Sequence, residues 1–203
     1  MANDLGSSAT EANSSLFAKC DVQSACNVSG DGGGDVPGYV EADWMEFKGG
    51  GELDVGGIVR DNQGGWVGGF SRRIRLSNSF VAELWGLRDG LILCCNLNIT
   101  SIIVELDAKT IVDIFQNSDY ENNVVSPILD DCRQLICRFQ RIQFKHCFRQ
   151  ANRCADRLAR MAADRNLDFI SFESPPMDLV NVMEEDFHGM YMTRLCLEHD
   201  VAF

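Results

Sequence analysis

The sequence predicts an α/β domain in which a mixed sheet of five strands is flanked by helices. Strand-like segments come first and form hairpins, and later strands alternate with segments of helical periodicity. The run Ser101–Leu106 is short and apolar, which is typical of a strand buried on both faces. We predict three regions: a disordered leader at 1–38, the α/β domain at 39–165 and an acidic C-terminal extension at 166–203.

The first three strands are predicted to be consecutive and antiparallel. They cover Tyr39–Asp43, Asp54–Arg60 and Trp66–Phe70. Glycine-rich turns at Gly49–Gly51 and Asp61–Gly64 separate them.

The remaining elements follow from changes in the spacing of apolar residues. Ser79 is a candidate N-cap for a helix in which Leu84, Leu87 and Leu91 recur at helical spacing. Further predicted elements are the strand Ser101–Leu106, a helix carrying Ile111, Ile114 and Phe115, a helix opened by Ser126-Pro127, a strand over Ile142–His146 and a last helix over Ala151–Arg165. The residues after the last helix are either an appended helix or a loose extension.

Composition limits the cellular setting. The nine cysteines are odd in number and form no C-x-x-C pair, which favours reduced thiols in the nucleus or cytoplasm. No run of eighteen apolar residues predicts a membrane span, and no signal sequence is visible at the start of the chain.

Charge is distributed unevenly along the chain. The net charge is −12, yet nine of the 18 Lys and Arg residues lie between Arg133 and Arg165. This segment is either a solvated helix face or a surface that binds phosphates. Nucleic acid is therefore not excluded as a partner, and oligomeric state is not predicted.

Four carboxylates stand at strand ends and helix starts. Asp43 ends the first strand, Glu83 and Asp156 lie in first turns of helices, and Asp107 follows the buried strand. Carboxylates placed in this way can converge on one edge of an α/β sheet. Such a cluster suits Mg²⁺, and two ions can promote displacement at a phosphate.

Each of these carboxylates also has a local explanation. The helix dipole would stabilise Glu83 and Asp107 by about 0.3–1 kcal/mol each, and Arg153 and Arg160 could pair with Asp156 on the surface. Other residues compete with Asp43 as the acid of the first strand, namely Glu41, Glu46 and Asp54.

Four sequence motifs occur together with specific spacing. They are GGIVRDNQGGWVGGFSRRI at Gly56–Ile74, A-E-L-W at Ala82–Trp85, V-E-x-D at Val104–Asp107, and H-x-x-R-x-x-N-x-x-A-D-x-L-A at His146–Ala159. The combination resembles plant ribonuclease H-like domains, the reverse-transcriptase-like modules related to retroelements. The resemblance covers about residues 39–189.

The resemblance implies a metal-dependent endonuclease that hydrolyses the RNA strand of RNA–DNA hybrids and leaves 5′-phosphate and 3′-hydroxyl ends. It implies two Mg²⁺ ions, or Mn²⁺ as a substitute, held by Asp43, Glu83, Asp107 and Asp156. His146 would assist proton transfer or product release. Contacts to the nucleic acid are expected from Arg149, Asn152 and Arg153.

The first strand departs from the family's pattern, which is N-x-D-G. No glycine follows Asp43, and the bulky Trp44 stands where the substrate backbone is expected. This departure favours an alternative function: a catalytically inactive, domesticated retroelement domain that binds nucleic acid or a protein partner.

Overall fold

The structure, a computed structural model, describes residues 40–49, 52–74, 78–116, 126–149, 152–165 and 168–187. The predicted leader, the middle of the first glycine turn and the chain after residue 187 lie outside these ranges. The strands are β1 (Val40–Gly49), β2 (Glu52–Arg60), β3 (Trp66–Ile74), β4 (Ser101–Leu106), β5 (Arg141–His146) and β6 (Phe169–Phe172). The helices are α2 (Ser79–Asn96), α3 (Lys109–Gln116), α4 (Ser126–Ile136), α5 (Arg153–Arg165) and α6 (Met177–Phe187).

The predicted mixed sheet with flanking helices is confirmed, with one strand more than expected. The strand order is β5-β4-β1-β2-β3-β6. β1, β2 and β3 are antiparallel neighbours, whereas β4 runs parallel to both β1 and β5. The unpredicted strand is β6, which pairs antiparallel with β3. It is only four residues long, too short for a period-2 pattern to stand out.

β1 extends six residues beyond its predicted end at Asp43. Its pairing with β2 continues without a register shift to Gly49, opposite Glu52. The polar residues Glu46 and Lys48 hide this continuation in the sequence. Pairing of this part of β1 with β2 supplies hydrogen bonds that outweigh a weak local strand propensity.

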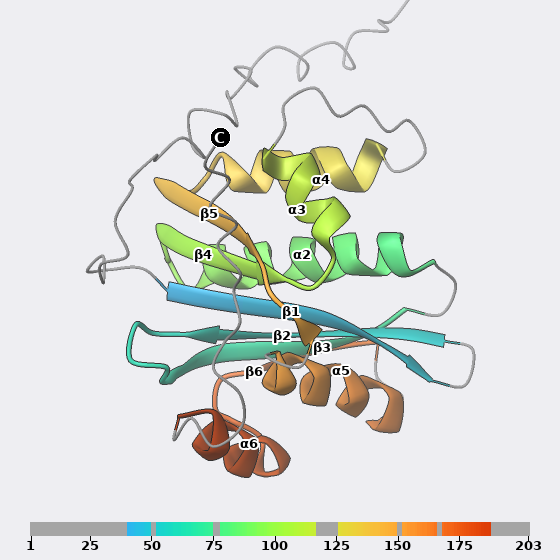
Figure 1. Ribbon diagram of the computed structural model, residues 1–203, viewed down its shortest axis with the longest axis vertical. Helices are drawn as coiled ribbons and strands as arrows, with labels where there is room; N and C mark the ends of the chain where they lie inside the picture. Colours follow the sequence, from blue (N-terminus) through green and yellow to red (C-terminus); the bar gives the residue numbers. More distant parts are fainter. Residues whose placement is uncertain are drawn as a thin grey trace, which may run out of the picture.

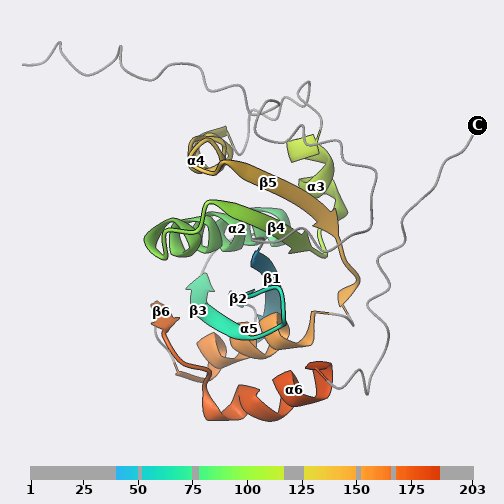
Figure 2. The same ribbon diagram turned by 90° about the vertical axis from the view of Figure 1, so that its left-hand side faces the viewer.

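Helices cover both faces of the sheet. Helices α2, α3 and α4 lie on one side, while α5 and then α6 lie on the other (Figures 1 and 2). The α2 helix begins at Ser79, but its N-cap is Asn78, whose Oδ1 accepts a hydrogen bond from the Val81 N–H at 2.9 Å. Asparagine and serine are both good N-caps, so the predicted cap was wrong by one residue.

Two glycines allow helices to approach the sheet closely. A Cβ on Gly90 of α2 would lie 2.0 Å from Trp44 Nε1, and a Cβ on Gly56 of β2 would lie 2.2 Å from the backbone nitrogen of Ala159 in α5. Close approach of α2 and α5 fixes the positions of Glu83 and Asp156 relative to β1. No helix within the described ranges combines the length and apolar character needed to cross a membrane.

Candidate active site

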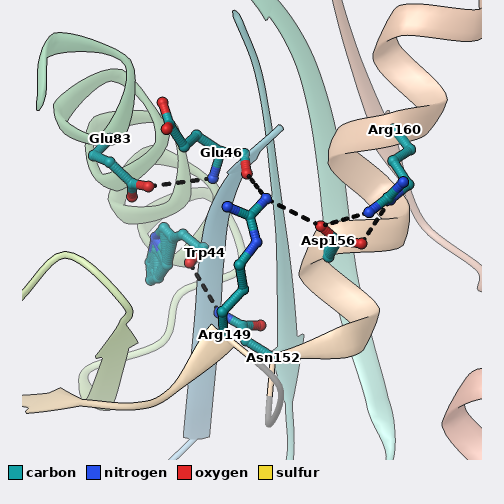
Figure 3. Close-up of polar contacts among 7 residues, drawn as sticks. All are labelled: Trp44, Glu46, Glu83, Arg149, Asn152, Asp156 and Arg160. Atoms are coloured by element: carbon teal, nitrogen blue, oxygen red, sulfur yellow. Dashed lines mark hydrogen bonds and ion pairs between the residues drawn. The ribbon is translucent and has the colours of Figure 1, made fainter. Parts of the chain in front are cut away.

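Three carboxylates from three different elements meet beside β1. Glu83 lies in the second turn of α2 and is 5% exposed. Asp107 follows the last residue of β4, and its carboxyl group hydrogen-bonds to that of Glu83. Glu46 of β1 completes the group, because its backbone N–H donates to Glu83 Oε1 at 3.3 Å (Figure 3). We call Glu46, Glu83 and Asp107 the carboxylate cluster.

Burial and mutual repulsion shift the acidity of this cluster. The pKa of Glu83 is raised well above its usual value, first by burial and then by the nearby carboxylates of Asp107 and Glu46. Burial also raises the pKa of Asp107, although the guanidinium of Arg149 opposes the shift. Glu83 is therefore the partner that holds a proton in the Glu83–Asp107 pair, which is how two close carboxyl groups avoid ionising together.

Each member of the cluster has one buried oxygen that accepts no hydrogen bond. These atoms are Glu46 Oε2, Glu83 Oε2 and Asp107 Oδ1. Buried carboxylate oxygens without a donor are costly, and a hard divalent cation is the ligand that such oxygens prefer. The donor set therefore fits Mg²⁺ chemically. In the side-chain arrangement seen here, no three His, Cys, Asp or Glu residues of the described ranges form a ready metal site, so cation binding requires a rotamer change.

The structure does not bring Asp43, the predicted acid of the first strand, into the carboxylate cluster. Asp43 and Glu46 are three residues apart in a regular strand, so their side chains point to opposite faces of the sheet. Asp43 is buried, and its Oδ2 lies 3.9 Å from Arg60 Nε.

Asp156 is held by arginines. It accepts hydrogen bonds from Arg160 Nε at 2.6 Å and from Arg149 Nη2 at 3.3 Å. Arg149 Nη2 also donates to the carbonyl oxygen of Glu46 at 2.9 Å. The Arg149 guanidinium thus lies between β1 and Asp156 (Figure 3). This guanidinium links the predicted fourth carboxylate to the cluster but also neutralises it.

His146 is the last residue of β5 and lies level with Leu106, the residue before Asp107. Its positive form would lower the pKa of Asp107. The imidazole makes an edge contact with the ring of Phe148, with 5.4 Å between ring centroids. The structure therefore places His146 near Asp107, which in turn contacts Glu83.

Three other residues of this region make contacts within the protein. Asn152 is only 2% exposed, and its Nδ2 donates to the carbonyl oxygen of Trp44 at 2.9 Å. It therefore connects the start of α5 to β1 instead of facing a nucleic acid. Trp44 is not an obstacle to substrate, because its indole is buried against Gly90 of α2. The predicted contact residue Arg153 is half-buried and pairs with Glu185 of α6, with 2.6 Å between Nη2 and Oε2.

The fold and the carboxylate cluster define a ribonuclease H-like domain. Solved ribonuclease H domains share the architecture. The N-terminal domain of a Mycobacterium tuberculosis protein, fused to maltose-binding protein, has a TM-score of 0.57 and 24% identity over 62% of this chain and 94% of that one. Ribonuclease H1 of Halobacterium salinarum has the same TM-score and identity over 63% of this chain and 98% of that one. At this identity the likeness shows the fold, and the predicted fold class is confirmed.

The chain belongs to the reverse transcriptase-like family, whose sequence model matches residues 47–162. An Arabidopsis thaliana protein named provisionally as a ribonuclease H protein is 31% identical over 139 residues. The match covers 68% of this chain but 22% of that protein, so the chain corresponds to a minor part of its relative's length. These findings confirm the predicted relationship to plant reverse-transcriptase-like domains. The matched segment contains Glu83, Asp107, His146 and Asp156, but it begins after Asp43 and Glu46.

Proposed function

We propose that this chain binds RNA–DNA hybrids and hydrolyses the RNA strand with the help of a divalent cation, leaving 5′-phosphate and 3′-hydroxyl ends. The observation that carries the proposal is the carboxylate cluster, in which three neighbouring acidic side chains each have one buried oxygen without a hydrogen-bond donor. A positive charge is the simplest ligand that would relieve this arrangement. In this proposal Glu46, not Asp43, supplies the carboxylate of β1.

The residues around the cluster have separate roles in this reaction. Glu46, Glu83 and Asp107 would hold the cation, with Mg²⁺ as the expected ion and Mn²⁺ as a substitute. A bound cation supplies charge stabilisation at the phosphate and makes a water molecule more acidic. Glu83 gives up its proton as the positive charge binds, because its raised pKa reflects burial and nearby negative charge. His146, beside Asp107, would transfer a proton or assist product release.

Recognition of the hybrid is proposed to depend on the sugar–phosphate backbone. Arg149 is half exposed next to the carboxylate cluster, where its guanidinium can exchange Asp156 for a phosphate. A related fold, that of a ribonuclease H1 called LC11, has been solved in complex with an RNA/DNA hybrid. The fold similarity to that protein supports a hybrid as the partner. No base-specific readout is expected, because hybrids are recognised by shape and 2′-hydroxyl groups.

The second candidate function is a binding domain without hydrolysis. Two observations favour it: the first strand lacks the N-x-D-G pattern, and the Arg149 guanidinium neutralises Asp156. In this case the domain would bind nucleic acid or a protein partner through the same surface. We also propose that the protein works in a reducing compartment, the nucleus or the cytoplasm, where the described cysteines stay free thiols.

Cleavage of a labelled RNA–DNA hybrid separates the two functions. Wild-type protein in Mg²⁺, and separately in Mn²⁺, is compared with Asp107→Asn, while binding of each protein to the hybrid is measured in EDTA. Metal-dependent cleavage that disappears in the variant supports the hydrolase. Binding without any cleavage by folded wild-type protein contradicts hydrolysis and leaves the binding domain.

A further inference from the structure

A basic groove lies beside the carboxylate cluster, on the α5 side of the sheet. It has a volume of about 540 Å³ and is open to solvent. Its lining consists of Arg149, Arg153, Asp156, Arg157, Arg160 and Val182. Four guanidinium groups and one carboxylate leave it with a net positive charge, although the whole chain is acidic. We call this the arginine groove.

The arginine side chains of the groove are positioned by α5 and its neighbours. Arg153, Arg157 and Arg160 are spaced by four and three residues, so they share one face of α5. Arg160 stacks on the ring of Phe47, with its Cζ 4.4 Å from the ring centroid. Arg149 bridges the groove to β1 through its bond to the Glu46 carbonyl. Through Arg149 the groove therefore adjoins the backbone of β1 at Glu46, the strand that carries one acid of the carboxylate cluster.

The helix α6 contributes negative charge to the same place. Leu179 of α6 is fully buried in a small core that contains Ile58 and Leu158, and Val182 and Met183 pack against this core. Figure 2 shows α6 lying along α5. Apolar packing thus holds α6 against α5 and places the acidic side chains of α6 next to the arginines of α5.

Two ion pairs join α6 to the arginines of α5. Arg153 Nη2 lies 2.6 Å from Glu185 Oε2, and Arg157 Nη2 lies 3.8 Å from Asp178 Oδ2. Both pairs are partly exposed, and exposed ion pairs contribute little to stability. Arginine binds phosphate oxygens with its planar fork at least as well as it binds a carboxylate. A phosphate can therefore replace either carboxylate at small cost.

We propose that the arginine groove binds the phosphodiester backbone of a nucleic-acid strand that passes the carboxylate cluster, and that Asp178 and Glu185 occupy the places of two of its phosphates. The acidic side chains of α6 then weaken binding and make it selective for polyanions able to displace both of them. This inference rests on the proposed nucleic-acid partner, but it does not require hydrolysis.

The test is binding of a fluorescent RNA–DNA hybrid in EDTA over a series of salt concentrations. The variant Asp178→Asn/Glu185→Gln is compared with wild type and with Asp130→Asn/Asp131→Asn. The control removes two exposed acids of α4 that also pair with arginines, but on the opposite side of the sheet. Thermal unfolding of all proteins verifies that they are folded.

Neutralising the α6 acids is expected to tighten hybrid binding by about 3- to 30-fold. The slope of log K against log salt should steepen by about one to two, because up to two more phosphates are contacted. The α4 control should change neither quantity by as much. Adding Arg153→Gln/Arg157→Gln to the α6 variant should abolish the gain.

The other outcomes separate failure of the groove proposal from failure of the proposed function. If wild type binds the hybrid and the α6 variant has the same affinity and slope, the groove proposal is wrong and the proposed function is unaffected. If the affinity gain is found but no cleavage occurs in Mg²⁺ or Mn²⁺, hydrolysis is wrong and the groove stands. If no protein binds the hybrid at any salt concentration, both proposals are overturned.

Discussion

The two sides of β1 differ in how their charged side chains are buried and paired. On the α2 side, Glu46, Glu83 and Asp107 bring like charges together in a buried place with three oxygens that accept no hydrogen bond. On the α5 side, the acids and arginines are partly exposed and are paired with each other, as in the contacts of Asp156 with Arg149 and Arg160. Acidic groups dominate the carboxylate cluster, whereas four arginines surround Asp156 on the α5 side.

The proposed function assigns a different ligand to each side. Buried carboxylates without a partner reduce the stability of the folded chain, and the proposed cation would offset this cost. Exposed ion pairs are weak and easily exchanged, which suits a surface that must release its own acids to bind phosphates. The following variants test this contrast, starting with the largest expected effect.

Asp107→Asn should reduce hybrid cleavage by more than about 100-fold, because loss of even an indirect contact to a metal ligand costs 10- to 100-fold. Affinity for the hybrid in EDTA should stay within about threefold, since the arginines are unchanged. The control is Asp113→Asn in the neighbouring helix α3. Cleavage kinetics at saturating substrate measure the effect, and full activity of Asp107→Asn would remove the cluster from the mechanism.

Gly90→Ala should lower the free energy of unfolding by about 1–3 kcal/mol through overpacking, because its Cβ would overlap the indole of Trp44. Gly86→Ala in the same helix is the matched control. Its Cβ would make an ordinary contact at 3.5 Å with Val55, and alanine favours helix by up to about 1 kcal/mol over glycine. Urea unfolding compares the two, and equal destabilisation would contradict the packing described for α2 on β1.

The raised pKa of Glu83 predicts two opposite pH dependences. Without cations, stability should fall as pH rises from 4.5, the ordinary pKa of a glutamate, toward the raised pKa of Glu83, because the folded state binds more protons than the unfolded state in that window. Affinity for Mn²⁺ should increase over the same window, since the cation competes with the proton. Calorimetry at several pH values measures both, and the stability trend should weaken in Glu83→Gln. Mn²⁺ affinity independent of pH would count against the cluster as its site.

Asp156→Asn should have the smallest effect, lowering the free energy of unfolding by no more than about 1 kcal/mol because its ion pairs are exposed. A decrease of 3 kcal/mol or more in the free energy of unfolding, measured with urea, would contradict this view. It would show that the ion pairs of Asp156 are needed for stability and are not readily exchanged for a phosphate.

The sequence predicted the parts of the site that depend on local signals. The places of Glu83 near a helix start and of Asp107 after an apolar strand follow from spacing, their choice as site residues followed from the family resemblance, and the structure places the two in contact. The choice between Asp43 and Glu46 depends on where β1 ends, which is set by its pairing with β2 and is hidden by the polar residues of this segment. The contacts of α6 with α5 are non-local. They depend on the burial of Leu179 under Ile58, more than a hundred residues away.

Replacing Glu46 tests the proposed cation site most directly. Cation binding, measured by Mn²⁺ titration calorimetry, and hybrid cleavage are compared in wild type, Glu46→Gln and Asp43→Asn, each shown to be folded by thermal unfolding. We predict that Glu46→Gln weakens Mn²⁺ binding and slows cleavage by about 10-fold or more, while folded Asp43→Asn retains both. Loss of Mn²⁺ binding in Asp43→Asn, with no change in Glu46→Gln, would contradict this prediction.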